Sequence, residues 1–460
     1  MSAPKRKDAA DHMSASKRKS AAERMSCKAR AILTAYCTAT FLIAPLGALF
    51  LCYKKRRDPP YGRRVFELLG CYHGQLKPTA PTIWFHTVSV GEAIAARPLI
   101  REFVTRHPER KVIVTTTTTT GAAEIQKIEG VQHVFAPLDS PLAVNAFIRT
   151  FKPSHLFIME TELWPCLLHS AHHHGVTTVV FNARMPEKTC LKYQDHLRLS
   201  TDLIAAPLDL VLCQTKDDQG RFARIGVPAQ KIKRTGSLKY DLHPNEALFQ
   251  HARSIYRLWQ EQAQAKGQEC QVLGAISTHE GEEEMILETY YSLQQIYPNL
   301  RLILVPRHQS GVTRAQVFLQ DIKGSFALKT EFDRNLTGFT QDVLLGNTMG
   351  EIEFYLGLCD LIFMGGSLVD IGGHNPLEPA YFSLPIITGR YYYNFHEQYE
   401  NLIEHGGAYV ASDHHSLYSI SEMLLQDKAK LTAIGMCAFD VQQAGRGAIA
   451  ATLQALEATL

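Results

Sequence analysis

Charged side chains directly follow several apolar runs of this 460-residue sequence. Glu92 comes soon after "TIWFHTV", Glu160 and Glu162 follow "SHLFIM", and Arg307 follows "LRLILVP". A carboxylate can accept the proton that a hydroxyl nucleophile must lose, and the planar guanidinium of arginine can donate two parallel hydrogen bonds to a phosphate or carboxylate. The structural alternatives are a favourable charge at a helix N-terminus for Glu92 and solvation at a helix start for Glu160 and Glu162.

A glycine-rich stretch, "GGSLVDIGGHNPLEPA" at residues 365–380, follows the apolar run "LIFM". A strand, a glycine turn and a helix in succession present backbone N–H groups to an anion. The turn leads into Asn375, Pro376, Leu377 and Glu378, so an amide and a carboxylate lie next to it.

The stretch "GNTMGEIEFY" places Met349, Gly350 and Glu351 at the start of a predicted helix. This arrangement could receive a phosphate or the edge of a nucleotide. The alternative is an ordinary helix that Asn347 or Thr348 caps.

From about residue 81, short apolar runs alternate with helical sequence, which predicts parallel sheets covered on both faces. Turn residues cluster near 234–245 and the pattern then restarts, so we expect two similar α/β domains with a cleft between them. Ligands of such sheets lie beyond the carboxyl ends of the strands, where all of these motifs fall. Lys239 of "GSLKYD" lies in the linker, where a cation would suit an acidic sugar or a phosphate, although a lone loop lysine is often simply solvated.

The sequence favours neither a metal centre nor a bound cofactor. His172, His173 and His174 are adjacent, and adjacent residues on a helix point in different directions. There is no Asp-x-Asp element to hold a divalent cation, and the absence of G-x-G-x-x-G after the first strand argues against a dinucleotide oxidoreductase. Ten cysteines without a C-x-x-C pair fit reduced thiols.

Basic charge is concentrated near the N-terminus. Residues 1–64 hold 15 Lys and Arg against 4 Asp and Glu, so the rest of the chain carries −8 of an overall +3. This distribution argues for a membrane surface and against a nucleic-acid partner. Residues 1–30 contain "MSAPKRKDAADH" and its near-copy "MSASKRKSAAER", which predicts a disordered tail, with adhesion to anionic lipid as the alternative.

Residues 31–53 are 23 consecutive uncharged residues, which is long enough to cross a ~30 Å hydrocarbon core. The apolar run is too long for a cleavable signal peptide, so we expect an uncleaved membrane anchor. Both flanks are basic, which leaves its orientation open. Pro45 and Gly47 interrupt the segment, so a shallow monotopic insertion is the alternative to a single pass.

Seven stretches in this order resemble the bacterial 3-deoxy-D-manno-octulosonic acid (Kdo) transferases: "WFHTVSVGE", "METELWP", "GSLKYD", "STHEGEE", "VPRH", "GNTMGEI" and "GGSLVDIGGHNPLEPA". The resemblance covers about residues 30–440, and the basic repeat departs from the usual start of the family. It implies the GT-B fold, with two Rossmann-like domains that face a cleft. The acceptor-binding domain would span residues 54–238 and the CMP-Kdo-binding domain residues 239–460, with the last helices packing back on the first domain.

The family implies transfer of Kdo from CMP-Kdo to a lipid A precursor, lipid IVA, during lipopolysaccharide core biosynthesis. The reaction would invert the anomeric centre without a metal or cofactor, and because members differ, the number of Kdo units added stays open. CMP-sugars are cytosolic, so the catalytic body would lie on the cytoplasmic side of the inner membrane. Basic residues would dock it on anionic lipid headgroups, namely Lys54 to Arg57, Arg63 and Arg64.

The resemblance also implies residue roles. Glu92 matches the proton acceptor, and Glu162 and Lys239 match residues that stabilise the transition state. The positions that match the CMP-binding residues are Pro306, Arg307, Met349, Gly350, Glu351, Asn375, Pro376, Leu377 and Glu378.

Two alternatives remain at this stage. One is another membrane-associated GT-B glycosyltransferase with a UDP donor. The other is a membrane-tethered nucleotide sensor without catalysis, which the presence of Glu92, Glu162 and Lys239 argues against.

Overall fold

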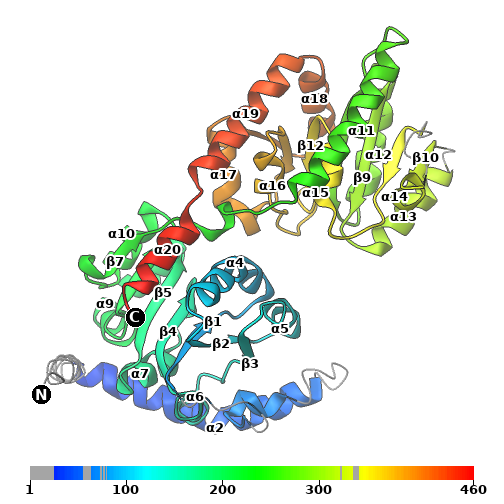
Figure 1. Ribbon diagram of the computed structural model, residues 1–460. Coiled ribbons are helices and arrows are strands. Elements are labelled where there is room, and N and C mark those ends of the chain that lie inside the picture. The colour runs from blue at the N-terminus through cyan, green and yellow to red at the C-terminus, as the bar shows by residue number, and fades with distance from the viewer. Residues whose placement is uncertain are drawn as a thin grey trace, which may run out of the picture. The chain divides into compact units, whose positions relative to one another are not determined.

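The computed structural model describes residues 25–54, 64–72, 75, 78, 80–321, 324–334 and 341–460. The chain divides into two compact units, Met1–Asp241 with Gly447–Leu460 as unit 1, and Leu242–Arg446 as unit 2 (Figure 1). Residues 1–24 of the predicted tail and the basic residues Lys55, Arg56, Arg57 and Arg63 lie outside the described residues.

Unit 1 is built on a sheet of seven parallel strands in the order β3-β2-β1-β4-β5-β6-β7. The strands are β1 (Thr82–His86), β2 (Lys111–Thr116), β3 (Val131–Phe135), β4 (Pro153–Met159), β5 (Thr177–Ala183), β6 (Leu210–Cys213) and β7 (Ile232–Arg234). The helices are α4 (Val90–Arg106), α5 (Thr119–Ile125), α6 (Pro141–Phe151), α7 (Pro165–His173), α8 (Glu187–Gln194), α9 (Leu197–Ser200), α10 (Lys216–Arg224) and α20 (Ala448–Glu457). Two apolar clusters pack on the sheet, one around Trp84 and one around Phe85, because neighbouring strand residues point to opposite faces.

Unit 2 repeats this design with seven parallel strands in the order β10-β11-β9-β8-β12-β13-β14. The strands are β8 (Gln271–Thr278), β9 (Leu300–Pro306), β10 (Phe326–Leu328), β11 (Val343–Leu345), β12 (Leu361–Met364), β13 (Ile386–Gly389) and β14 (Ala408–Ala411). The helices are α11 (Glu246–Gln264), α12 (Glu282–Gln294), α13 (Gln309–Asp321), α14 (Lys329–Phe332), α15 (Ile352–Gly357), α16 (Leu377–Tyr381), α17 (His396–Glu404), α18 (His414–Leu425) and α19 (Lys428–Ala444).

Each sheet has a point at which the strand order changes direction. This switch lies between β1 and β4 in unit 1 and between β8 and β12 in unit 2. Open α/β sheets bind ligands outside the carboxyl ends of the strands at such a point. Glu92, Glu160 and Glu162 follow β1 and β4, and the glycine stretch follows β12. The topology therefore brings predicted site residues to the switch of each sheet.

Helix α2 (Cys27–Lys54) begins four residues before the predicted anchor and continues through Pro45. By length and composition, Cys27–Phe50 could cross a membrane. One stripe of small residues packs on unit 1, with Ala29, Ala44 and Ala48 buried, and Figure 1 shows the helix running alongside α6 and α7. Most of the large apolar side chains on the helix are exposed, including Phe41, Leu42, Ile43, Leu46, Leu49 and Phe50.

The threonine run at 115–120 joins β2 to α5. In the structure β2 ends at Thr116 and α5 begins at Thr119. Thr118 is the reason, because its hydroxyl accepts a hydrogen bond of 3.1 Å from the N–H of Gly121 and so caps the helix.

Candidate active site residues in the two units

Glu92 is held in place by the first turn of α4. Its Oε2 accepts a hydrogen bond of 2.8 Å from the N–H of Val88, and its Oε1 accepts one of 2.9 Å from the hydroxyl of Ser89. The N–H of Glu92 in turn donates to the Ser89 hydroxyl at 3.2 Å, which completes a capping box. The carboxylate therefore helps to cap the first turn of α4, and the same contacts fix its position in the loop region that follows β1.

The surroundings of Glu92 make it a stronger base than an ordinary carboxylate. Burial raises its pKa from 4.5 to about 7, against the hydrogen bonds from Val88 and Ser89, and the negative charges of Glu160 and Glu162 raise it further. This electrostatic influence places the three carboxyl groups in one neighbourhood. A pKa near neutrality suits a group that must accept a proton from a hydroxyl.

Glu160 and Glu162 are fixed by different contacts. Glu160 directly follows β4 and has a φ of 56°, a left-handed conformation that costs energy outside glycine. Its N–H donates to the carbonyl of Phe181 at 3.0 Å, and its Oε2 accepts from Nε of Arg184 at 3.0 Å. Glu162 accepts a hydrogen bond of 2.8 Å from the indole of Trp164, and burial raises the pKa of Glu162.

His86 supports this arrangement and was not singled out from the sequence. It is the last residue of β1, has no exposed surface, and its ring meets that of Trp164 edge to face at 4.8 Å between centroids. Burial lowers the pKa of His86 to about 3, so the ring is neutral. Its Nδ1 shares a hydrogen bond with the hydroxyl of Thr115, which fixes the ring behind the Trp164–Glu162 contact.

Lys239 lies on the short 3₁₀ turn Leu238–Tyr240 and belongs to unit 1, as Glu92 and Glu162 do. Asn182, the penultimate residue of β5, accepts a hydrogen bond of 3.0 Å from the N–H of Leu238. On the other side, the carboxylate of Asp241 accepts hydrogen bonds from the N–H groups of Gly447 and Ile449, at the start of α20. The position of Lys239 is therefore set from β5 and from the returning C-terminal segment.

In unit 2, Pro306 and Arg307 lie at the end of β9, where the N–H of Arg307 donates to the carbonyl of Thr278 at 2.9 Å. Asn375 donates from its side chain to Glu378 at 3.3 Å and accepts from the N–H of Leu377 at 3.1 Å. Burial raises the pKa of Glu378 to about 7, while the positive charge of Arg307 opposes this shift. The charge of Arg307 therefore reaches Glu378.

The 349–351 stretch has a different cap from the one considered above. Glu351 itself is the N-cap residue of α15, so the alternative that Asn347 or Thr348 caps this helix is wrong. Asn347 instead binds Thr330, and the hydroxyl of Thr348 binds that of Tyr355. Residue 349 is a strongly exposed methionine, at 84%, and Gly350 has a φ of 78°. The carboxylate of Glu351 lies 3.6 Å from Nζ of Lys329.

The glycine turn after β12 already holds an anion, and that anion belongs to the protein. The buried carboxylate of Glu282 accepts hydrogen bonds from the N–H groups of Gly366 at 2.7 Å and of Ser367 and Leu368 at 2.9 Å each. It also accepts from the N–H of His279 at 2.9 Å. These backbone groups are thus occupied, and a bound phosphate must be met by other donors.

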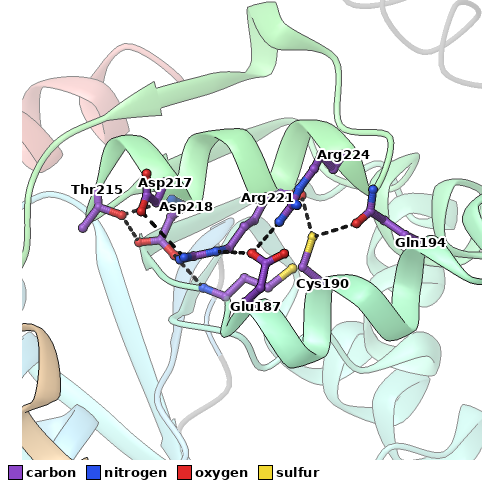
Figure 2. A network of polar contacts seen from close by, with 9 residues as sticks. Glu187, Cys190, Gln194, Thr215, Asp217, Asp218, Arg221 and Arg224 are labelled. Atoms are coloured by element: carbon purple, nitrogen blue, oxygen red, sulfur yellow. Dashed lines mark hydrogen bonds and ion pairs between the residues drawn. The ribbon is translucent and has the colours of Figure 1, made fainter.

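A polar network ties α8 to α10 beside the loop that follows β5 (Figure 2). Glu187 accepts from Arg221 at 3.0 Å and from Arg224 at 2.6 Å. Asp218 accepts from the N–H of Met185 at 2.8 Å and from the hydroxyl of Thr215 at 2.6 Å. The buried Asp218 contacts hold the loop that carries Arg184, the partner of Glu160.

Within the described residues, no group of three or more His, Cys, Asp or Glu side chains could hold a metal ion. The three consecutive histidines at 172–174 do not form such a group.

The two seven-stranded parallel α/β sheets define a protein of the GT-B fold class. Similar solved structures include UDP-GlcNAc 2-epimerase from Neisseria meningitidis, with 13% identity, a TM-score of 0.52, and coverage of 81% of this chain and 100% of that one. A glycosyltransferase from Rickettsia africae ESF-5 has 11% identity, a TM-score of 0.50, and coverage of 83% and 98%. At this level of identity the likeness concerns the fold.

Sequence comparison narrows this class to one family. Residues 63–242 match the model described as 3-deoxy-D-manno-octulosonic-acid transferase. The 3-deoxy-D-manno-octulosonic acid transferase of Haemophilus influenzae is 34% identical over 92% of this chain and 97% of its own length. That of Bordetella pertussis is 33% identical over 83% and 88%. The chain belongs to the Kdo transferase family, which confirms the resemblance drawn from the seven motifs.

Proposed function

We propose that the protein transfers Kdo from CMP-Kdo to lipid IVA, the lipid A precursor, with inversion at the anomeric carbon. The observation that carries this proposal is the position of the Glu92 carboxylate, which a capping box holds beside two further carboxylates. Burial raises the pKa of Glu92 to about 7. Family membership supports the Kdo donor, and the basicity of Glu92 supports proton removal from an acceptor hydroxyl. A second transfer onto the Kdo already added is an extension that product masses would reveal.

In the proposed reaction Glu92 accepts the proton of the attacking lipid hydroxyl. The oxygen of that hydroxyl forms a bond to the anomeric carbon of Kdo, and the bond to the CMP phosphate oxygen breaks. Positive charge develops on the sugar ring as CMP departs, and Glu162 would stabilise it while Lys239 neutralises the sugar acid or the departing phosphate. Both groups are positioned by contacts within unit 1, through Trp164 for Glu162 and through Asn182 and Asp241 for the turn of Lys239.

Unit 2 would bind the nucleotide. Arg307 would contact the phosphate and Glu378 a ribose hydroxyl, and the action of the Arg307 charge on Glu378 supports a common ligand. The remaining proposed contacts are Pro306, Met349, Gly350, Glu351, Asn375, Pro376 and Leu377.

Helix α2 would hold the protein on the inner membrane, with the catalytic body on the cytoplasmic side. The helix is held against the rest of unit 1 at two separated points. Ser26, which precedes the helix, donates from its N–H and its hydroxyl to Asp202, and the hydroxyl of Tyr36 donates to Asp139 at 2.8 Å. With Ala48 also buried, unit 1 lies along much of the helix, which favours monotopic insertion over a single pass.

The experiment that tests this proposal incubates the full-length protein with lipid IVA and CMP-Kdo and follows the lipid by mass spectrometry. The expected result is a lipid heavier by one or more Kdo residues, with CMP inhibiting at a far lower concentration than UDP. An unchanged lipid contradicts the proposal, and stronger inhibition by UDP would favour the UDP-donor alternative.

A further inference from the structure

Two histidines form a hydrogen-bonded pair at the switch point of the unit 2 sheet. His279 follows β8 and His374 lies in the glycine stretch after the neighbouring β12. Their Nε2 atoms are 2.8 Å apart, and the rings are nearly parallel, with centroids 5.1 Å apart and an interplanar angle of 9°. Neither residue was identified as a candidate from the sequence, since 95 positions separate them.

The chemistry of this contact depends on protonation. A hydrogen bond between two Nε2 atoms requires that one carry a proton and the other a lone pair. In the neutral pair one Nδ1 is then an acceptor and the other a donor, whereas one added proton makes both Nδ1 groups donors. Neither Nδ1 atom has a hydrogen-bond partner within the described part of the chain. The pair can therefore present two N–H donors to a ligand after gaining a single proton.

The charges around the pair oppose that proton while no anion is present. Arg307, His308 and Arg314 face His279, and Arg307 and His308 also face His374. Burial is the largest cause that lowers the pKa of both rings, to about 4 for His374. His279 lowers the pKa of His374 further, and Arg307 and His308 lower the pKa of both rings. The one carboxylate acting on His279, that of Glu282, is committed to four backbone N–H groups, and the hydroxyl of Tyr399 donates to the carbonyl of His374 rather than to its ring.

The contacts of the glycine turn explain why an anionic ligand at this place would need donors from side chains. A Cβ on Gly366 would lie 3.1 Å from Cδ2 of His374 and 3.3 Å from Cδ2 of His279, so the pair packs directly on the turn. The N–H groups of Gly366, Ser367 and Leu368 serve Glu282 and cannot also bind a ligand anion. The two imidazoles and the neighbouring Arg307 are side-chain donors at this edge of the sheet that do not serve Glu282.

We propose that the His279–His374 pair binds the phosphate of the donor nucleotide beside Arg307 and takes up one proton when it does so. This inference rests on the proposed function for the identity of the nucleotide. Because a proton is taken up, nucleotide affinity falls as the pH rises, by up to about tenfold per pH unit between the pKa of the free pair and that of the complex.

Calorimetry on the full-length protein in detergent tests the proposal. CMP is titrated at pH 6.5 and 7.5 in pairs of buffers that differ in ionisation enthalpy, which gives the number of protons exchanged. Uptake of up to one proton is expected for the wild type, and that uptake should disappear in His374→Gln, which cannot titrate. The phosphate of CMP can itself gain a proton on binding. Because His374→Gln is titrated with the same ligand, the difference in proton uptake between the wild type and the variant reports on the histidine pair alone.

Three further arms make the result specific. His308→Gln, which removes an exposed imidazole outside the pair, should retain the proton uptake. Cytidine, which lacks the phosphate, should bind without proton uptake. Titration with free Kdo tests whether the pair binds the carboxylate of the sugar instead of the phosphate. If His374→Gln does not fold, as judged by its thermal unfolding, His279→Gln replaces it.

The outcomes separate the two claims. CMP binding without proton uptake, or equal uptake in the wild type and in His374→Gln, overturns the role of the pair and leaves the proposed function intact. Uptake with free Kdo and none with CMP overturns the assignment to phosphate. A protein that does not bind CMP at all contradicts the proposed donor as well.

Discussion

The side-chain oxygen of Asn182 accepts a hydrogen bond of 3.0 Å from the N–H of Leu238, the residue before Lys239. Asn182 is fully buried and has a φ of 49°, a conformation that asparagine and glycine adopt more readily than other residues. One strained strand end thus fixes the turn that presents a proposed catalytic lysine.

Replacement of Asn182 should therefore affect catalysis and stability differently. We expect Asn182→Gly, which tolerates the positive φ, to lose the hydrogen bond and lower the rate by about tenfold, at a cost of about 1 kcal/mol in unfolding free energy. Asn182→Ala should cost about 1 kcal/mol more, because alanine is strained at this φ. Steady-state rates and urea unfolding give both numbers. If Asn182→Gly were as active as the wild type, the turn would not depend on this contact.

The raised pKa of Glu92 makes a prediction about stability. Its folded pKa of about 7 lies above its ordinary value of 4.5, so its contribution to stability is complete below about pH 4.5 and is lost as the pH rises through 7. Glu92→Gln stays neutral, so from pH 5 to pH 8.5 the variant should gain about 1–3 kcal/mol relative to the wild type. Glu109→Gln, whose parent side chain is 65% exposed, is the control that should show no such trend in urea unfolding.

Glu282 should be among the carboxylates most important for the stability of unit 2. Glu282→Ala leaves four backbone N–H donors without their acceptor, so the loss of unfolding free energy should exceed about 3 kcal/mol. The matched control is Glu284→Ala in the same helical turn, which is exposed and should change stability by less than about 0.5 kcal/mol. Equal effects of the two substitutions in chemical denaturation would contradict the role given to Glu282.

The exposed apolar face of α2 should determine membrane association. Leu46 is 66% exposed and Leu42 64%, so Leu46→Asp combined with Leu42→Asp should release much of the protein from membranes into the supernatant after ultracentrifugation. Thr38→Asp, on an exposed but polar position of the same helix, should release less. Retention of the double variant at wild-type levels would show that another surface holds the protein on the membrane.

The sequence predicted the central strands of both sheets because β-branched and apolar runs such as "KVIVTT" and "LRLILVP" are buried on both faces. The short edge strands β3, β7, β10 and β14 were not predicted, since they are only 3 to 5 residues long and partly exposed. Short strands at a sheet edge depend on a neighbouring strand more than on their own composition.

The candidate site also divides into residues with a local sequence signal and residues that depend on distant partners. Glu92 and Glu162 could be chosen as candidates from the sequence because a carboxylate after a strand is a local signal, and their roles stay predictions. Glu282 and the His279–His374 pair could not, because their partners lie 84 to 95 positions away in the chain. Glu282 stands in the quoted stretch "STHEGEE". Only the folded turn shows that it occupies the backbone donors expected to face a ligand.

The most direct test of the account is the rate of Kdo transfer to lipid IVA by Glu92→Gln, measured with the affinity of the same variant for CMP. We expect transfer to fall by about 10²–10⁴-fold, because glutamine cannot accept the hydroxyl proton as Glu92 does in the proposed mechanism, while the CMP affinity stays within about twofold of the wild type. Near-normal transfer by this variant would contradict the assignment of Glu92 as the base, and with it the proposed mechanism.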